Sequence, residues 1–213
     1  MNQITQKIFT FLGEIAETVL IALAIFLAVY IFLAQPHRVK GDSMEPNFLN
    51  GELILTDKIS YRFRQPDRGE VIVFKAAPTN GKLDFIKRIV GLPSEKILVK
   101  NGSVFINGKL LKENYLGREI RANLKDGGFL KNGQEYLIPE NSFFVMGDNR
   151  GASFDSRDWG PVQKDEIIGK AFLVYWPVFP SKQSKGLRLV PKAQFEISDN
   201  TSFGNLQELT IAL

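Results

Sequence analysis

A serine in a tight turn is the first residue of this chain whose type and surroundings could do chemistry. Ser43 lies in residues 41–46 (GDSMEP), where the glycine and the proline favour a bend that projects the serine hydroxyl. A hydroxyl placed in this way can act as a nucleophile if a neighbouring base takes its proton. Taken alone, the segment is more simply interpreted as an ordinary turn.

Lys87 lies in a predicted strand and could supply that base. Residues 85–93 (FIKRIVGLP) alternate so that Phe85, Lys87 and Ile89 share one face. A lysine between two large apolar side chains either extends its amine to solvent or becomes desolvated. Desolvation lowers the pKa of an amine, and a drop of ~3 units would make it a usable general base near neutral pH.

A polar loop at residues 147–158 (GDNRGASFDSRD) is the third candidate. Its glycine, asparagine and aspartate residues are typical of Asx turns, and a calcium loop is an alternative. The EF-hand pattern of alternating ligands that ends in glutamate is absent, which argues against calcium. The loop could instead support a catalytic group, with Ser153 as a hydrogen-bond partner and Asp155 and Arg157 as an ion pair.

The composition of the chain excludes most other catalytic chemistry. The chain has no cysteine and one histidine, which rules out thiolate zinc sites, iron–sulfur clusters, cysteine nucleophiles and sites with several histidines. His37 lies beside the apolar N-terminal segment, which argues against a Ser–His–Asp triad with Ser43. A net charge of +4 over 213 residues is too mild to indicate nucleic-acid binding. A serine nucleophile with a lysine base remains, with no cofactor and no metal.

An apolar segment near the N-terminus predicts a membrane anchor for these residues. Residues 18–34 (TVLIALAIFLAVYIFLA) carry no charge and would extend over roughly 25 Å as a helix. A core helix would keep a polar stripe, and a signal-peptide core is shorter and precedes a small-x-small cleavage site. We therefore expect an uncleaved transmembrane helix within residues 1–36. Arg38 and Lys40 follow this segment and by the positive-inside rule favour the cytoplasm for the rest of the chain, but these few charges do not settle the side.

The rest of the chain is predicted to be mainly β. Runs of β-branched and aromatic residues between turn residues predict strands at 52–56, 70–75, 83–90, 96–100, 104–107, 142–146 and 167–175. Asn101-Gly102 between two such runs predicts a two-residue hairpin turn. We expect a β domain built from residues 37–94 and 141–197, with a hairpin-rich β insertion at 95–140. The tail at 198–213 is either frayed or a short helix on the membrane.

Two surface features allow either a neutral or a membrane-related interpretation. Basic residues at 58, 62, 64, 68 and 75 form either a solvated face or a contact with anionic lipid headgroups. The aromatic stretch 176–180 (WPVFP) is either the end of a core strand or a segment at a membrane interface.

Taken together and in this order, the motifs resemble those of type I signal peptidases, membrane-bound serine proteases that remove signal peptides. Residues 43–46 (SMEP) match the family's S-M-x-P box, and residues 68–74 (RGEVIVF) resemble its R-G-D-x-V-V-F strand. Residues 87–93 (KRIVGLP) resemble its K-R-x-x-G-x-P box, and residues 147–157 (GDNRGASFDSR) resemble its G-D-N-R-x-x-S-x-D-S-R box. The resemblance implies a mainly antiparallel β catalytic domain with a small β insertion, preceded by one N-terminal transmembrane helix.

The resemblance also implies roles for the residues of the three motifs. Ser43 would be the nucleophile and Lys87 the general base. Ser153 would orient the Lys87 amine, while Asp155 and Arg157 would brace the loop that carries it.

Substrate contacts follow from the same resemblance. Gly41 stands where some relatives have a serine that donates to the oxyanion, so the oxyanion would be held by backbone N–H groups, chiefly that of Ser43. An extended signal peptide would pair as a strand with residues 84–86 and 39–41. The substrate-binding residues would then be Val39, Asp84, Phe85 and Ile86.

The implied function is the removal of N-terminal signal peptides from exported preproteins after a small-x-small motif. The implied partners are signal peptides and membrane lipids, with no nucleic acid and no metal. The family's catalytic domain lies outside the cytoplasm at the plasma membrane, which conflicts with the charges that flank the helix.

Two alternatives to this function remain open. Another Ser–Lys protease, such as a self-cleaving repressor or a conjugation-system peptidase, is one, although a repressor would carry a helix-turn-helix and no membrane helix. A non-catalytic, membrane-tethered β module is the other, and such a relative would be expected to have lost Ser43 or Lys87.

Overall fold

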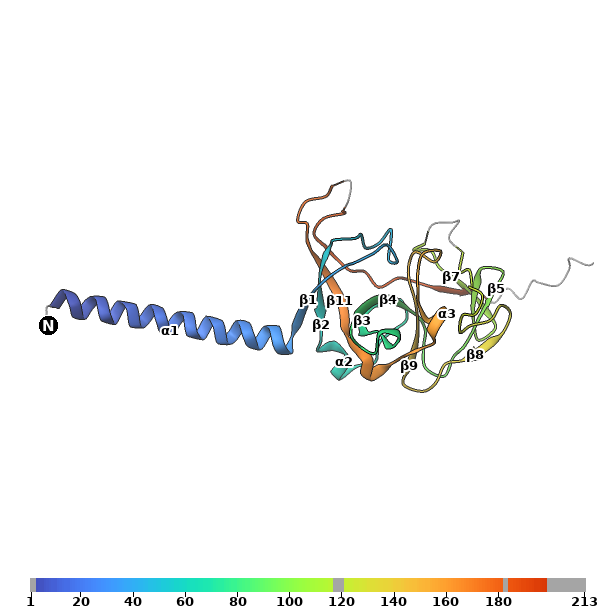
Figure 1. The fold of residues 1–213 in the computed structure, drawn as a ribbon, viewed down its shortest axis with the longest axis horizontal. Coiled ribbons are helices and arrows are strands. Elements are labelled where there is room, and N and C mark those ends of the chain that lie inside the picture. Colours follow the sequence, from blue (N-terminus) through green and yellow to red (C-terminus); the bar gives the residue numbers. More distant parts are fainter. Residues whose placement is uncertain (1–2, 117–120, 182–183, 199–213) are drawn as a thin grey trace, which may run out of the picture.

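A long apolar helix leads directly into a β-sheet domain. The computed structural model describes residues 3–116, 121–181 and 184–198. Helix α1 (Gln3–Phe32) projects away from the strands and runs into strand β1 (Ala34–Arg38) (Figure 1). Its segment Thr10–Ala28 is long and apolar enough to cross a membrane, and none of that segment is buried against the rest of the protein. A helix that is apolar all round and lacks a protein partner fits a single membrane span.

Eight strands form the larger sheet, and all of its described pairings are antiparallel. The strand order is β1-β2-β11-β3-β4-β9-β10, and β12 pairs with β11 beside this path. The strands after β1 are β2 (Leu53–Asp57), β3 (Val71–Lys75), β4 (Asp84–Gly91), β9 (Ser142–Met146), β10 (Val162–Gln163), β11 (Ile167–Trp176) and β12 (Arg188–Leu189).

Five further strands form a second antiparallel sheet in the order β13-β7-β6-β5-β8. They are β5 (Lys96–Lys100), β6 (Ser103–Ile106), β7 (Lys109–Lys112), β8 (Glu135–Leu137) and β13 (Glu196–Ser198). Asn101 and Gly102 join β5 to β6, and both have positive φ angles, of 53° and 78°, as a tight two-residue hairpin requires.

Only short helical segments accompany the strands in the part of the chain after α1 that the structure describes. The α-helical turns are α2 (Ser60–Phe63) and α3 (Ser156–Trp159), and the 3₁₀ turns are η1 (Ala77–Thr79) and η2 (Lys164–Glu166).

The central strands of the larger sheet are buried on both faces. Along β3, Val71 and Val73 pack into one apolar cluster, whereas Ile72 and Phe74 pack into another on the opposite side. The same alternation continues on β4, where Ile86 packs against the first cluster and Phe85 and Ile89 pack in the second. Lys87 therefore shares a face with Phe85 and Ile89, as the sequence predicts.

The sequence predicted the mainly β fold class correctly, and each predicted strand is present within one or two residues of its expected bounds. Strand β1 was missed because its sequence, AQPHR, is polar and contains a proline. Proline is tolerated there because β1 is the edge strand of the sheet. The division into domains remains a prediction, and residues 199–213 of the predicted tail lie outside the described residues.

Gly69 offers a test of how tightly the chain before β13 is held against the larger sheet. Gly69 has a φ of +88°, and a Cβ there would lie 2.1 Å from the carbonyl oxygen of Ala193. Because this neighbour is backbone and cannot move aside easily, Gly69→Ala is expected to lower the free energy of unfolding by about 2–4 kcal/mol. Chemical unfolding of the full chain in detergent, followed by tryptophan fluorescence, measures this loss.

Gly108→Ala is the matched control. Gly108 has a φ of +79° but no atom within 4 Å of the added Cβ, so only conformational strain of about 1 kcal/mol is expected. Equal losses in the two variants would contradict the constraint imposed by Ala193.

Candidate active site

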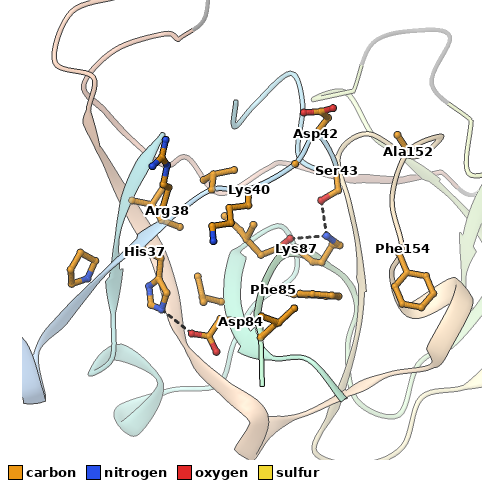
Figure 2. A pocket seen from close by; sticks show the side chains of 17 residues that line it. His37, Arg38, Lys40, Asp42, Ser43, Asp84, Phe85, Lys87, Ala152 and Phe154 are labelled. Carbon is orange, nitrogen blue, oxygen red and sulfur yellow. Dashed lines mark hydrogen bonds and ion pairs between the residues drawn. The ribbon is translucent and has the colours of Figure 1, made fainter. Parts of the chain in front are cut away.

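Ser43 and Lys87 meet in a groove of the larger sheet (Figure 2). Lys87 Nζ lies 2.7 Å from Ser43 Oγ and donates a second hydrogen bond of 3.1 Å to the carbonyl oxygen of Ile86. Lys87 comes from the middle of β4 and is only 5% exposed, whereas Ser43 comes from the turn that follows β1. A hydroxyl and an amine at this distance can exchange a proton directly.

The turn that carries Ser43 is held by the loop after β9. Gly41 begins the turn with a φ of +81°, and its N–H donates to the side chain of Asn50. The backbone N–H of Asn149 donates to the carbonyl oxygen of Ser43 at 3.0 Å. The side-chain amide of Asn149 donates to the backbone carbonyl oxygen of Asp42 at 3.1 Å. The backbone on which the Ser43 hydroxyl stands is therefore fixed by contacts over a hundred residues away in sequence.

Gly147 allows the close approach of the two segments. A Cβ at this position would lie 2.3 Å from Ser153 Oγ and 2.4 Å from the carbonyl oxygen of Ser43. The glycine at the start of the polar loop is thus required for space.

Burial gives the Lys87 amine the properties of a base. Removal from water lowers its pKa from the ordinary value of 10.5 to about 8, against the opposing effects of the Asp155 and Asp148 carboxylates. An amine with this pKa is about one-tenth neutral at pH 7, compared with less than a thousandth for an exposed lysine. The neutral form has the lone pair that can accept the Ser43 proton.

Asp148 and Arg88 lock the strand that carries Lys87. Arg88 donates through Nε and Nη2 to both carboxylate oxygens of Asp148, at 2.8 and 2.7 Å, and through Nη1 to the carbonyl oxygen of Gly69 at 2.8 Å. Both charged side chains are buried. This bidentate pair joins β4 to the loop after β9 in one fixed geometry.

Asp155 and Arg157 form the second buried ion pair beside the lysine. Arg157 donates to both oxygens of Asp155 at 2.8 Å, and the N–H of Gly147 donates to Asp155 Oδ2 at 3.0 Å. Burial would raise the pKa of the Asp155 carboxyl, but Arg157 and these hydrogen bonds hold it below the ordinary value. Asp155 and Arg157 thus form a hydrogen-bonded ion pair, and the bracing role predicted for this pair remains a prediction.

Ser153 is buried between these groups, but its Oγ has no hydrogen-bond partner among the described residues. Its bond to Lys87 is therefore not formed in this structure, and its orienting role remains a prediction.

The second sheet also reaches the site, which the sequence did not predict. Arg150 Nη1 donates to Glu113 Oε2 at 2.6 Å, and Arg150 Nη2 donates to Tyr115 Oη at 2.7 Å. The ring of Tyr115 in turn lies 4.7 Å from the Arg88 guanidinium. Glu113 and Tyr115 follow β7, within the region predicted to be a hairpin-rich β insertion. The only sequence signal was the arginine of the GDNR motif itself.

The groove around Ser43 has a volume of about 610 Å³ and lies between two open strand edges. Strand β1 is the last strand of the sheet, and the pairing of β4 with β9 begins only at Arg88. Both N–H and C=O of Val39 are bonded to the β2 side, which leaves the backbone of Arg38 and Lys40 facing the groove. Val39, Asp84, Phe85 and Ile86 all line it, and Ala152 and Phe154 line it as well. The role of the first four in substrate binding remains a prediction.

His37 lines the groove but does not contact Ser43. Its Nδ1 lies 3.0 Å from Thr56 Oγ1, and its Nε2 lies 3.4 Å from Asp84 Oδ2. A Ser–His–Asp triad is thus not assembled. Across residues 3–116, 121–181 and 184–198, no group of three or more histidine or acidic side chains could hold a metal ion.

A buried serine–lysine pair beside two open strand edges is the site expected of a hydrolase that acts on extended polypeptide. Comparison with protein families gives a match over residues 12–176 to the family of signal peptidases, peptidase S26. The chain therefore belongs to the signal peptidase family, a family of serine endopeptidases.

Two relatives found by sequence agree with this assignment. The chain is 36% identical over 169 residues to a probable signal peptidase I-2 from Synechocystis, covering 78% of this chain and 73% of the relative. It is 32% identical over 171 residues to signal peptidase IB from Staphylococcus aureus, covering 75% and 87%. A solved signal peptidase I from Enterococcus faecalis is 31% identical, with a TM-score of 0.40, covering 50% of this chain and 97% of that one.

Removing the carboxylate of Asp155 tests the bracing of the site. Asp155→Ala leaves the Arg157 guanidinium buried without its partner, so the free energy of unfolding is expected to fall by about 3–5 kcal/mol. Asp67→Ala is the control, because Asp67 pairs with Lys192 at the surface, where the loss should stay below about 1 kcal/mol. Urea titration of both variants measures the difference, and similar small losses would show that the buried pair does not brace the loop.

Proposed function

We propose that this protein removes signal peptides from exported preproteins, with Ser43 as the nucleophile and Lys87 as the general base. The observation that carries the proposal is the 2.7 Å contact between Lys87 Nζ and Ser43 Oγ in a groove with open strand edges. Burial of the amine, which lowers the pKa of Lys87 to about 8, supports its role as the base.

The proposed reaction follows from the position of the amine. Neutral Lys87 accepts the proton of the Ser43 hydroxyl as Oγ attacks the carbonyl carbon of the scissile bond. The lysine then gives this proton to the nitrogen of the mature chain, which leaves as an amine, and the signal peptide remains as an ester on Ser43. A water molecule loses its proton to Lys87 and hydrolyses the ester. The developing oxyanion is held chiefly by the backbone N–H of Ser43, since Gly41 offers no side-chain donor.

The substrate is proposed to bind as an added strand between β1 and β4. The backbone groups of Arg38 and Lys40 on one side, and of residues 84–86 on the other, supply hydrogen-bond partners for an extended chain. Alternate substrate side chains then point to the floor of the groove, where Val39 and Ile86 belong to the apolar core. A shallow apolar floor beside Ser43 admits small side chains, which supports cleavage after a small-x-small motif.

Helix α1 is proposed to anchor the site at the membrane, with the catalytic domain outside the cytoplasm. Its direct junction with β1 brings the groove close to the end of the apolar helix (Figure 1). Trp176 ends strand β11, and its side chain is 56% exposed, while that of Phe179 is 80% exposed. Exposed aromatic side chains of this kind support contact with membrane lipids.

Substitution of the pair tests the proposed chemistry. Ser43→Ala and Lys87→Ala are expected to lower cleavage of a labelled preprotein by at least about a thousandfold, because the first removes the nucleophile and the second removes the base. Lys87→Arg is expected to be equally inactive, since a guanidinium stays protonated. Lys96→Arg is the control, because Lys96 is exposed on the second sheet. Turnover by purified Lys87→Arg comparable to that of the control would refute lysine as the base.

The pH dependence provides an independent test of the lowered pKa. Because only the neutral amine acts as a base, kcat/KM is expected to rise about tenfold per pH unit below pH 8 and to level off above it. The measurement is initial-rate cleavage of one preprotein between pH 5.5 and 10 at constant ionic strength. A midpoint near 10.5, the ordinary lysine value, would show that burial does not tune Lys87.

A further inference from the structure

The groove contains a polar pair that the reaction itself does not use. His37 Nε2 lies 3.4 Å from Asp84 Oδ2 and spans the space between β1 and β4 beneath the groove (Figure 2). The imidazole side chain is 13% exposed and that of Asp84 is 37% exposed, so the carboxylate is open to the groove while the ring is mostly covered. Thr56 on β2 holds the other ring nitrogen at 3.0 Å.

The His37–Asp84 pair lies two residues along the strands from the apolar floor formed by Val39 and Ile86. His37 precedes Val39 by two residues on β1, and Asp84 precedes Ile86 by two residues on β4, so each pair of neighbours shares a face. The floor is therefore apolar beside Ser43 and ionisable two residues further along. The two subsites are about 7 Å apart, which is the spacing of alternate residues in an extended substrate.

The direction of the substrate decides which of its residues reaches the pair. Both β1 and β4 run from the end of α1 toward the Ser43–Lys87 pair, so His37 and Asp84 lie on the helix side of the groove. A signal peptide that emerges from the membrane reaches the groove from that side. If the residue at the cleaved bond lies over Val39 and Ile86, the residue two positions before it lies over His37 and Asp84.

The ring nitrogen next to Asp84 has no hydrogen bond. His37 Nε2 is buried and has no such partner among the described residues. The Asp84 carboxylate is the part of the pair that is open to the groove, so a substrate hydroxyl can donate a hydrogen bond to it, while His37 holds the carboxylate from below. An apolar side chain of the same size would cover the carboxylate and offer it no donor.

We propose that His37 and Asp84 form a specificity subsite that selects serine or threonine over alanine or valine two positions before the residue at the cleaved bond. This inference rests on the proposed function and refines its small-x-small rule. It makes one of the two small positions polar and leaves the position beside Ser43 apolar.

Four versions of one preprotein test the proposal, carrying Thr, Val, Ser or Ala at that position and competing in one reaction. Threonine and valine have the same shape, so their ratio of kcat/KM isolates the hydroxyl. The wild-type enzyme is expected to favour Thr over Val, and Ser over Ala, by about tenfold. The same exchanges at the intervening substrate residue, whose side chain points away from the floor, are expected to leave kcat/KM unchanged.

Variants of the pair assign the effect to its residues. His37→Leu is expected to bring the Thr/Val ratio close to one, whereas His37→Gln, which keeps a polar side chain, is expected to retain part of the preference. Asp84→Leu is expected to reduce the ratio as His37→Leu does. Thermal unfolding of each variant checks that it is folded. The Thr/Val ratio of the wild-type enzyme tests the subsite without relying on any enzyme variant.

The possible results distinguish failure of the proposed subsite from failure of the proposed function. If the wild type cleaves all four preproteins with a Thr/Val ratio near or below one, the subsite is overturned while signal-peptide removal stands. A ratio that persists in His37→Leu also overturns it, because the selecting residue then lies elsewhere. If the wild type cleaves none of the four, the proposed function fails and the inference fails with it.

Discussion

The removal of one lysine amine from water is the constraint on which the rest of this structure depends. In the proposed chemistry, Lys87 must be buried to lose its proton near neutral pH, yet it must also reach Ser43 Oγ, which lies 2.7 Å from its amine. A buried amine is costly in the charged state, and lowering its pKa by two to three units costs roughly 3–4 kcal/mol in the protonated form. The surrounding fold provides this free energy through its apolar core on both faces of β3 and β4.

The charged groups around Lys87 fix the geometry of the site without raising the pKa of its amine back to the ordinary value. Arg88 with Asp148 and Arg157 with Asp155 are buried pairs, each bidentate, so neither carboxylate is free to bond the amine directly. Buried ion pairs contribute little net stability compared with apolar packing, but they tolerate few alternative arrangements. Their role here is to hold β4 and the loop after β9 in one register. The second sheet extends the network through Glu113 and Arg150.

In the proposed function, the open edges of β1 and β4 connect this chemistry to a substrate. An exposed strand edge is normally protected because it invites pairing with another chain. Here the edges face one groove whose floor changes from apolar at Val39 to polar at His37. The proposed strand addition would thereby be confined to the site where the serine lies, close to the end of the apolar helix α1.

The sequence by itself determined the mainly β fold, the apolar helix and the residues able to do chemistry. Alternation fixed the faces of β4, and the near-absence of histidine and cysteine left serine and lysine as the pair. Strand β1 escaped prediction because an edge strand tolerates Pro36 and polar residues, and such a sequence carries no hydrophobic pattern. Only the tertiary structure decided that Glu113 and Tyr115 reach Arg150, and that His37 lies over Asp84 rather than beside Ser43. These contacts join segments far apart in the chain, and periodicity and turn signals describe only neighbours in sequence.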